Sequence, residues 1–278
     1  GRARPGERHG MSEASESLRL FDGRGRPAEL APAAERLSGA DVVLFGELHG
    51  KRPVHALELE LARALLGARQ GRLVLGAEML EADDQLVVDE YLGGLIPHRH
   101  LAAEAKVWEN HESDYRPLLD LALENGLRFV ATNVPRRYAS LVARQGLPAL
   151  ERLSEEARRW IAPLPIQVDL DAPGYRDMLR MDLPMGGMPV APENLVAAQA
   201  VKDATMAHFI SRALLPGWLF LHVNGTFHSD DRGGICWQLE RIRPGVRVMT
   251  VASVLGDPSA FDDDWRDRGD YVAVLAGP

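Results

Sequence analysis

Two hydrophobic runs in this chain each break off into the same short pattern, Gly-x-x-His. The runs cover residues 41–49 (DVVLFGELH) and 218–228 (WLFLHVNGTFH). Apolar residues on both faces are typical of buried parallel strands, and a glycine lets the chain turn sharply as it leaves a sheet. Each histidine then lies just past the carboxyl end of a strand, where open α/β sheets bind ligands. We therefore expect His49 and His228 to meet at one edge of one sheet.

Strand-like and helix-like segments alternate along most of the sequence. The predicted strands cover 41–47, 72–78, 127–133, 217–224, 246–254 and 271–276. The predicted helices cover about 53–69, 83–92, 114–125, 193–214 and 234–242, with shorter ones after Pro135 and Ser154. This alternation predicts an α/β fold with a mostly parallel sheet and helices on both faces.

Two segments depart from the alternation. Residues 1–16 are rich in Pro, Gly and charge, and we expect them to be disordered, followed by a single α/β domain over 17–278. Residues 163–192 hold six prolines and four methionines, Met178, Met181, Met185 and Met188. We interpret them as a flap-like, partly helical excursion over a flat apolar ligand, although methionines also fill irregular cores. The fold is therefore expected to carry an appended helical and Met-rich part.

Composition excludes several classes of protein. A formal net charge of −8 disfavours a nucleic-acid surface, which needs a basic stripe. The sequence contains no run of 18 uncharged apolar residues, so it predicts no membrane-spanning helix. Cys236 is the single cysteine, so no intramolecular disulfide can form, which fits a reducing cytosol and a bridge-free secreted protein equally. The sequence lacks the nucleotide-binding loop G-x-x-x-x-G-K-[ST] and the G-x-S-x-G nucleophile elbow.

Four predicted strand ends deliver polar side chains, namely Glu47 with His49, then Glu78, Asn133 and His228. Carboxylates and imidazoles that meet in a crevice can bind a divalent metal, transfer protons or hold a polar ligand. We predict Glu47, His49 and His228 as ligands of Mn²⁺ or Zn²⁺, with Glu78 completing a catalytic set. The alternative is that these groups cap helices and turns.

Four residues are candidates for ligand binding. His55 falls in the first turn of the helix after His49, and Gln199 and Asp203 share one face of the long helix 193–214. Asn133 stands at a strand end two residues before Pro135. Each either contacts the site or belongs to a cap, a surface or a buried polar network.

A family resemblance follows from the order and spacing of these residues. The matching features are Gly46–His49, His55, Glu78, Trp108, Tyr115, Ala131–Arg136, Met185–Gly187, Ala198–Ala207 and Gly225–Ile235. Over about residues 35–255 the sequence resembles the ChaN-like haem-binding proteins. Their superfamily also holds TraB-like, Tiki-like and erythromycin-esterase-like proteins, some of which look like metal-dependent hydrolases.

The resemblance implies an α/β fold with an appended helical part and haem held by tyrosine at a homodimer interface. Tyr115 and Tyr175 are then the candidate haem ligands. It also implies an envelope protein on the periplasmic side, lipid-anchored before processing, that works with an outer-membrane haem receptor in iron acquisition. Two departures are the lack of a lipid-accepting cysteine near the N-terminus and Gly234-Ile235-Cys236 where relatives show Gly-Ile-Pro. A cytoplasmic location stays open.

Three functions therefore stand at this point. The first is haem binding, with haem as the small-molecule ligand. The second is hydrolysis by a divalent metal, which lowers the pKa of its bound water to about 7. The third is a non-enzymatic scaffold in which the strand-end groups serve stability alone.

Overall fold

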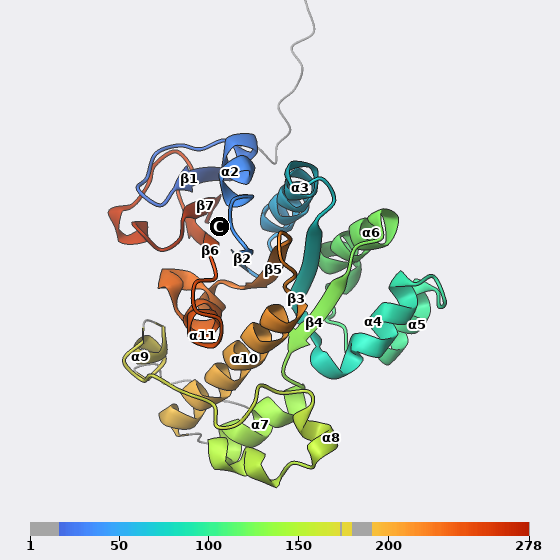
Figure 1. Ribbon diagram of the computed structural model, residues 1–278. Coiled ribbons are helices and arrows are strands. Elements are labelled where there is room, and N and C mark those ends of the chain that lie inside the picture. The colour runs from blue at the N-terminus through green and yellow to red at the C-terminus, as the bar shows by residue number, and fades with distance from the viewer. Residues whose placement is uncertain (1–16, 173, 180–190, 278) are drawn as a thin grey trace, which may run out of the picture.

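A seven-stranded sheet forms the centre of the computed structural model, which describes residues 17–172, 174–179 and 191–277 (Figure 1). Its strands are β1 (Leu18–Asp22), β2 (Val42–Glu47), β3 (Leu73–Glu81), β4 (Phe129–Asn133), β5 (Leu219–Gly225), β6 (Val248–Gly256) and β7 (Tyr271–Ala276). They lie in the order β1-β7-β6-β2-β5-β3-β4. Only β1 and β7 pair in antiparallel fashion within this sheet. The predicted mostly parallel α/β fold is confirmed.

Helices cover both faces of the sheet. They are α2 (Leu30–Leu37), α3 (Arg52–Ala68), α4 (Gln85–Leu92), α5 (His98–Glu104), α6 (Arg116–Asn125), α7 (Arg136–Gln145), α8 (Glu155–Arg158), α9 (Tyr175–Met178), α10 (Pro192–Ala213) and α11 (Gly234–Ile242). Figure 1 shows α3 and α6 on one side of the strands and α10 and α11 on the other.

The alternation of side chains along β2 explains these two layers. Val43 and Phe45 belong to the apolar cluster that includes α2, α3 and α6, whereas Val42 and Leu44 belong to the cluster with α10 and α11. All four are fully buried. Successive strand residues point to opposite faces, so a strand that is apolar throughout must be covered on both sides.

The order of the strands brings the two Gly-x-x-His segments together. β2 and β5 are parallel neighbours, with Gly46 opposite Asn224 and Glu47 opposite Gly225. β5 also pairs with β3, so the carboxyl ends of three strands lie side by side. His49 and His228 therefore leave the sheet at the same edge, as the sequence predicts.

The structure adds elements that the sequence pattern does not predict. β1 is short, and its position depends on backbone pairing with β7 from the far end of the chain. The strand predicted over 72–78 continues to Glu81, and its register against β4 shifts between Ala77 and Glu81. Such an irregularity changes the direction of side chains, and here Glu78 lies inside the strand rather than at its end.

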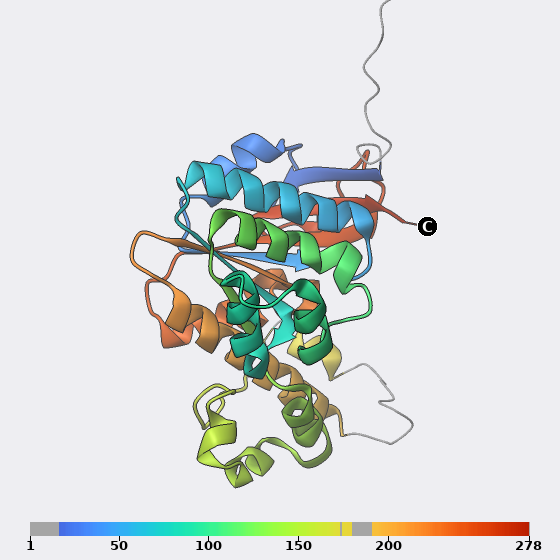
Figure 2. The same cartoon turned by 90° about the vertical axis from the view of Figure 1, so that its right-hand side faces the viewer.

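An appended helical part lies beyond the sheet. The segment from α7 through the 3₁₀-helix Leu147–Arg152 to α8 packs against α10 and stands apart from the strands in both views (Figure 2). In the predicted excursion, α9 is helical, and Met178 packs beside Tyr175 and Val196. Met181, Met185, Met188 and residues 1–16 lie outside the described residues. None of the described helices is long and apolar enough to cross a membrane.

Gly76 gives a direct test of the packing between β3 and its neighbours β5 and β4. A Cβ at this position in β3 would lie 2.7 Å from Cζ of the buried Phe220 and 3.0 Å from the Val130 carbonyl oxygen. Because overpacking a tight core costs about 1–3 kcal/mol, we predict that Gly76→Ala lowers the free energy of unfolding by about that amount in urea titrations.

Gly67→Ala is the matched control for this substitution. Gly67 lies near the end of α3, and a Cβ built there would meet no atom within 4 Å beyond its chain neighbours and the nearby backbone of its own helix. Alanine is the better helix former by up to about 1 kcal/mol, so this variant should be at least as stable as the wild type. Equal unfolding midpoints for the Gly76 and Gly67 variants would contradict the packing described.

Candidate functional site

A pocket of about 310 Å³ opens at the carboxyl ends of β2, β3 and β5, beside α10. Five of the predicted catalytic and ligand-binding residues line it: His49, Glu78, Asn133, Gln199 and His228. This volume falls at the lower end of the range for small-molecule sites, roughly 300–1,000 Å³. The strand-end crevice expected from the sequence is present, while the catalytic and binding roles of its residues stay predictions.

His228 lies between two carboxylates. Its Nε2 is 3.2 Å from Glu78 Oε1, and its Nδ1 contacts Asp203 of α10. The ring is buried. Burial alone would lower the pKa of His228, but the charges and hydrogen bonds of Glu78 and Asp203 outweigh it and raise that pKa to about 10. His228 is therefore an imidazolium at neutral pH.

Glu78 is held as the matching anion. Burial raises the pKa of this carboxyl group, but the charge and hydrogen bond of His228 and the Gly225 N–H, which donates to Glu78 Oε2 at 2.7 Å, hold the pKa well below its usual range. The Gln199 amide lies 3.0 Å from His228 Nδ1 and completes the wall of this network. The network is a buried anion–cation–anion chain.

Tyr175 anchors the other side of Asp203. Its hydroxyl donates to Asp203 Oδ2 at 2.5 Å, which ties α9 to α10. The ring is buried, and burial together with the Asp203 charge raises the pKa of Tyr175 far above its ordinary value. The predicted role of Tyr175 as a haem ligand stays a prediction that would require this hydrogen bond to break.

His49 stands at the pocket mouth and is oriented by Glu47. His49 Nδ1 lies 2.6 Å from Glu47 Oε1, and the same oxygen accepts a hydrogen bond from the Tyr115 hydroxyl at 2.7 Å. The His49 side chain is 46% exposed, and its ring meets Trp108 edge-on at 5.0 Å. The hydrogen bond to Glu47 raises the pKa of His49, although partial burial opposes it. Tyr115 is itself buried, so its predicted role as a haem ligand meets the same obstacle as that of Tyr175.

A second, deeper group of polar side chains lies behind Glu47. His55 Nδ1 is 3.5 Å from Glu47 Oε2 and 3.1 Å from Glu58 Oε2, while His55 Nε2 is 3.3 Å from Asp114 Oδ2. All four side chains are buried. Burial and the neighbouring Glu47 and Asp114 raise the pKa of Glu58 well above its ordinary value. His55 thus contacts the strand-end residues through Glu47.

The candidate metal ligands differ from the predicted set. Within the described ranges, one group of three has ligand atoms that all lie within 4.8 Å of one another, and it is Glu47, His55 and Glu58. The sequence predicts Glu47, His49 and His228 instead. Glu58 was not predicted as a site residue. The sequence did indicate that it is unusual, because a carboxylate lies between Leu57 and Leu61 on the apolar face of α3.

Other pocket residues were not predicted as site residues, although they lie within the features that carry the family resemblance. Lys202 and Arg136 add positive charge to the wall, and Phe227 and Trp108 add aromatic surface. Asn133 donates to the Glu78 carbonyl oxygen at 2.9 Å, so it braces the end of β4 against β3. The strand-end position of Asn133 was the signal that predicted it as a site residue.

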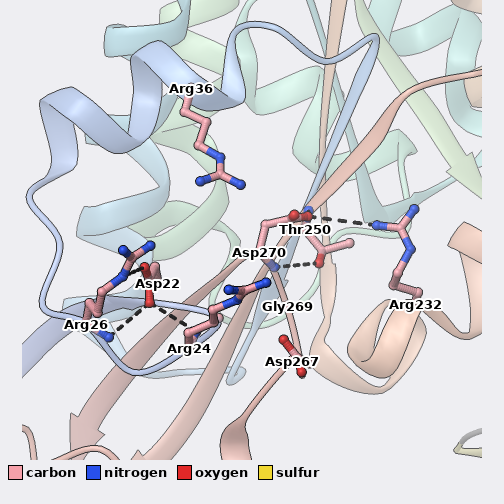
Figure 3. A pocket seen from close by; sticks show the side chains of 10 residues that line it. Asp22, Arg24, Arg26, Arg36, Arg232, Thr250, Asp267, Gly269 and Asp270 are labelled. Atoms are coloured by element: carbon pink, nitrogen blue, oxygen red, sulfur yellow. Dashed lines mark hydrogen bonds and ion pairs between the residues drawn. The ribbon is translucent and has the colours of Figure 1, made fainter.

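A larger pocket of about 450 Å³ lies elsewhere, beside the ends of β1 and β7 (Figure 3). Arg24, Arg36 and Arg232 reach into it, and Asp22 and Asp270 engage neighbouring groups there. No histidine lines this pocket. Size alone would favour it, but the groups suited to proton transfer or metal binding are gathered in the smaller pocket.

The two buried histidines of the β5 segment give a test of these electrostatics. Burial lowers the pKa of His222 to about 4, whereas Glu78 and Asp203 raise that of His228 to about 10. A raised pKa keeps the proton as pH rises, so between pH 6 and pH 8 we predict a neutral His222 and a doubly protonated His228. Long-range ¹H–¹⁵N spectra of ¹⁵N-histidine-labelled protein measure both states. A neutral His228 at pH 7 would refute the buried ion chain.

Comparisons with known structures agree with this fold. The structure is similar to one described as cofacial heme binding to ChaN of Campylobacter jejuni, with a TM-score of 0.71, 17% identity and coverage of 94% of this chain and 98% of that chain. It is also similar to the type III effector HopBA1, with a TM-score of 0.50, 14% identity and coverage of 91% and 95%. At these identities the likeness shows the fold alone.

Two sequence comparisons show which family the chain belongs to. Protein RETICULATA-RELATED 5, chloroplastic, from Arabidopsis thaliana is 28% identical over 214 residues, which are 70% of this chain and 28% of that protein's length. A family model described as haem-binding uptake, Tiki superfamily, ChaN matches residues 33–239. Because that match spans most of the sequence, the chain belongs to the ChaN haem-binding uptake family of the Tiki superfamily.

Proposed function

We propose that this chain binds haem at the mouth of the strand-end pocket, with His49 as a ligand of the iron. Family membership supports haem as the ligand class, and the similar Campylobacter jejuni structure is described as binding heme cofacially. The observation that carries the assignment is the half-exposed His49 ring, whose Nδ1 is engaged by Glu47. Bound haem would supply an iron centre for ligand or electron exchange.

His49 has the surroundings of a metal-binding imidazole. Histidines that bind metals almost always donate their other ring N–H to a carboxylate or carbonyl, which fixes the tautomer and raises the basicity of the free nitrogen. Glu47 Oε1 accepts such a bond from Nδ1, so in the neutral ring Nε2 carries the lone pair that would bind iron. Nε2 lies next to Gly225, where a side chain would fill the pocket: a Cβ there would come within 2.8 Å of it.

The walls of the pocket suit the rest of a haem molecule. Haem needs apolar cover on its faces, and Trp108 and the 68% exposed Phe227 offer aromatic surface. Its two propionates are anions, and Arg136 and Lys202 line the same pocket. Guanidinium and ammonium groups bind carboxylates through charge-assisted hydrogen bonds. Neighbouring residues therefore offer an axial ligand for the iron, apolar cover for the porphyrin faces and cationic partners for the propionates.

Hemin titration of purified protein tests the proposal. We predict saturable binding at micromolar hemin with a shifted Soret band, and at least about tenfold weaker binding for His49→Ala, which corresponds to about 1.4 kcal/mol. His100→Ala is the matched control, because His100 is an exposed histidine of α5 outside the pocket.

Tyr115→Phe and Tyr175→Phe separate this assignment from tyrosine ligation, which the family resemblance implies. Both hydroxyls donate to buried carboxylates, so these variants should keep the wild-type Soret position. If the Soret band changes in a tyrosine variant while His49→Ala binds hemin as the wild type does, the iron ligand is that tyrosine and not His49. No saturable hemin binding by the wild type would reject haem as the ligand.

The biological setting is a wider part of the same proposal. We infer a role in haem or iron acquisition at the bacterial envelope, on the periplasmic side, with an outer-membrane receptor and a second copy of the chain as partners. Membership of a haem-binding uptake family supports this setting. Sedimentation of the protein with and without hemin tests the homodimer, since a monomer in both states would remove it.

Hydrolysis is a second candidate, favoured by the Asp203–His228–Glu78 chain. A buried imidazolium can donate a proton to a leaving group, and the Glu47–His49 pair can accept one from water. A divalent ion in the pocket would activate that water further. In assays of chromogenic esters with added Mn²⁺ or Zn²⁺, we predict turnover that Glu78→Gln and His228→Gln abolish. If the wild type and both variants hydrolyse the esters at equal rates, Glu78 and His228 have a structural role alone.

A further inference from the structure

Behind the pocket, we propose a buried site for one divalent first-row transition-metal ion, bound by Glu47, His55 and Glu58. It is distinct from the haem site proposed at His49, because its ligand atoms face away from the pocket mouth. His55 and Glu58 come from the first two turns of α3, and Glu47 ends β2. Neither His55 nor Glu58 lines the pocket.

The spacing of the three side chains suits a metal ion. Ligand atoms about 2.1 Å from a tetrahedral zinc ion lie about 3.4 Å from one another. His55 Nδ1 is 3.5 Å from Glu47 Oε2 and 3.1 Å from Glu58 Oε2, and one ligand atom from each residue lies within 4.8 Å of the other two. An ion would therefore need little rearrangement of the side chains.

Unpartnered polar atoms point to a missing ligand. Glu47 Oε2 and Glu58 Oε1 are fully buried and accept no hydrogen bond within the described part of the chain. Glu47 and Glu58 are 1% and 0% exposed, respectively. A buried oxygen without a partner costs about 1–3 kcal/mol, and more when charged. A cation between the two carboxylates would satisfy both oxygens.

The balance of charge points the same way. Glu47, Glu58 and Asp114 bring three carboxyl groups around His55, and no lysine or arginine forms an ion pair with any of them in the described structure. Buried charges are normally paired or bound to metal. His49 reaches the group through Glu47 Oε1 alone, on the side opposite Oε2. A divalent cation would offset the excess negative charge.

The donor set selects the class of ion. An imidazole nitrogen together with carboxylate oxygens suits Mn²⁺, Fe²⁺, Co²⁺ or Zn²⁺, whereas Ca²⁺ and Mg²⁺ prefer oxygen ligands alone. Asp114 lies 3.3 Å from the other nitrogen of His55, the position from which a carboxylate orients a metal-binding ring. A single turn of π-helix, His111–Tyr115, delivers Asp114 and Tyr115 together, and such turns are frequent at functional sites.

The ion would act on the pocket through Glu47. One Glu47 oxygen would bind the metal while the other keeps its hydrogen bonds to His49 and Tyr115. The ion would thus join β2, α3 and the π-helical turn, while Glu47 Oε1 holds His49 with or without the ion. Its main competitor for the site is a single proton shared between Glu47 and Glu58.

Metal titration with a matched pair of variants tests the site. Protein stripped with EDTA and dialysed is titrated with ZnCl₂ or MnCl₂ by calorimetry, and we expect one ion per chain. Glu58→Gln preserves the shape of the side chain and should weaken binding at least tenfold. Glu60→Gln changes an exposed carboxylate of the same helix and should bind as the wild type does. His228→Gln, which alters the pocket alone, should also retain the ion.

A stability readout guards against a variant that binds poorly because it folds poorly. Excess Zn²⁺ should raise the Tm of wild type, Glu60→Gln and His228→Gln, since an ion that binds the native state stabilises it. The Tm of Glu58→Gln should not change. Loss of the ion in His228→Gln with retention in Glu58→Gln would place the metal in the pocket instead. A wild type that binds no ion, with a Glu58→Gln variant at least as stable, would assign the site to a shared proton.

Hemin titration of Glu58→Gln keeps the two proposals separate. This variant leaves His49, Glu47 and the pocket lining unchanged, so its Soret shift should remain even when the deep ion is lost. Failure of hemin binding in the wild type would reject the haem proposal and leave the metal result standing.

Discussion

The carboxylate of Glu47 is the interaction on which the arrangement of the site depends. It lies buried at the end of β2, the strand that pairs with both β5 and β6 in the middle of the sheet. Its Oε1 receives hydrogen bonds from His49 and Tyr115, and its Oε2 faces His55. One side chain therefore orients the exposed histidine at the pocket mouth and closes the polar group behind it. Because Glu47 lies at the end of a central strand, its carboxylate is held firmly enough to orient His49 and to contact His55 at once.

Charge pairing limits how this region can vary. The chain Asp203–His228–Glu78 holds a cation between two anions with little exposure to water. Removing one member of a buried ion pair leaves an uncompensated charge, which typically costs 3–5 kcal/mol. The fold places these residues on α10, β3 and the turn after β5, so three elements are tied together by electrostatics as well as by apolar packing.

The sequence predicts the fold and the meeting of the two histidines because both depend on local patterns. Buried strands that end in glycine and alternate with amphipathic helices leave few arrangements other than a parallel sheet. Glu58 left a local signal, a carboxylate on the apolar face of α3, but its contacts with Glu47 and His55 depend on tertiary packing. The inward position of Asp114 depends on a π-helical turn and left no such signal. The same limit applies to Tyr115 and Tyr175: the family resemblance proposes them as ligands, whereas three-dimensional contacts engage their hydroxyls.

A crystal structure of the protein grown with hemin would test the central claim most directly. The account predicts iron bound to His49 Nε2, with the His49–Glu47 hydrogen bond intact and the porphyrin in contact with Trp108 and Phe227. Iron bound to a tyrosine oxygen, or hemin seated away from the carboxyl ends of β2, β3 and β5, would contradict it.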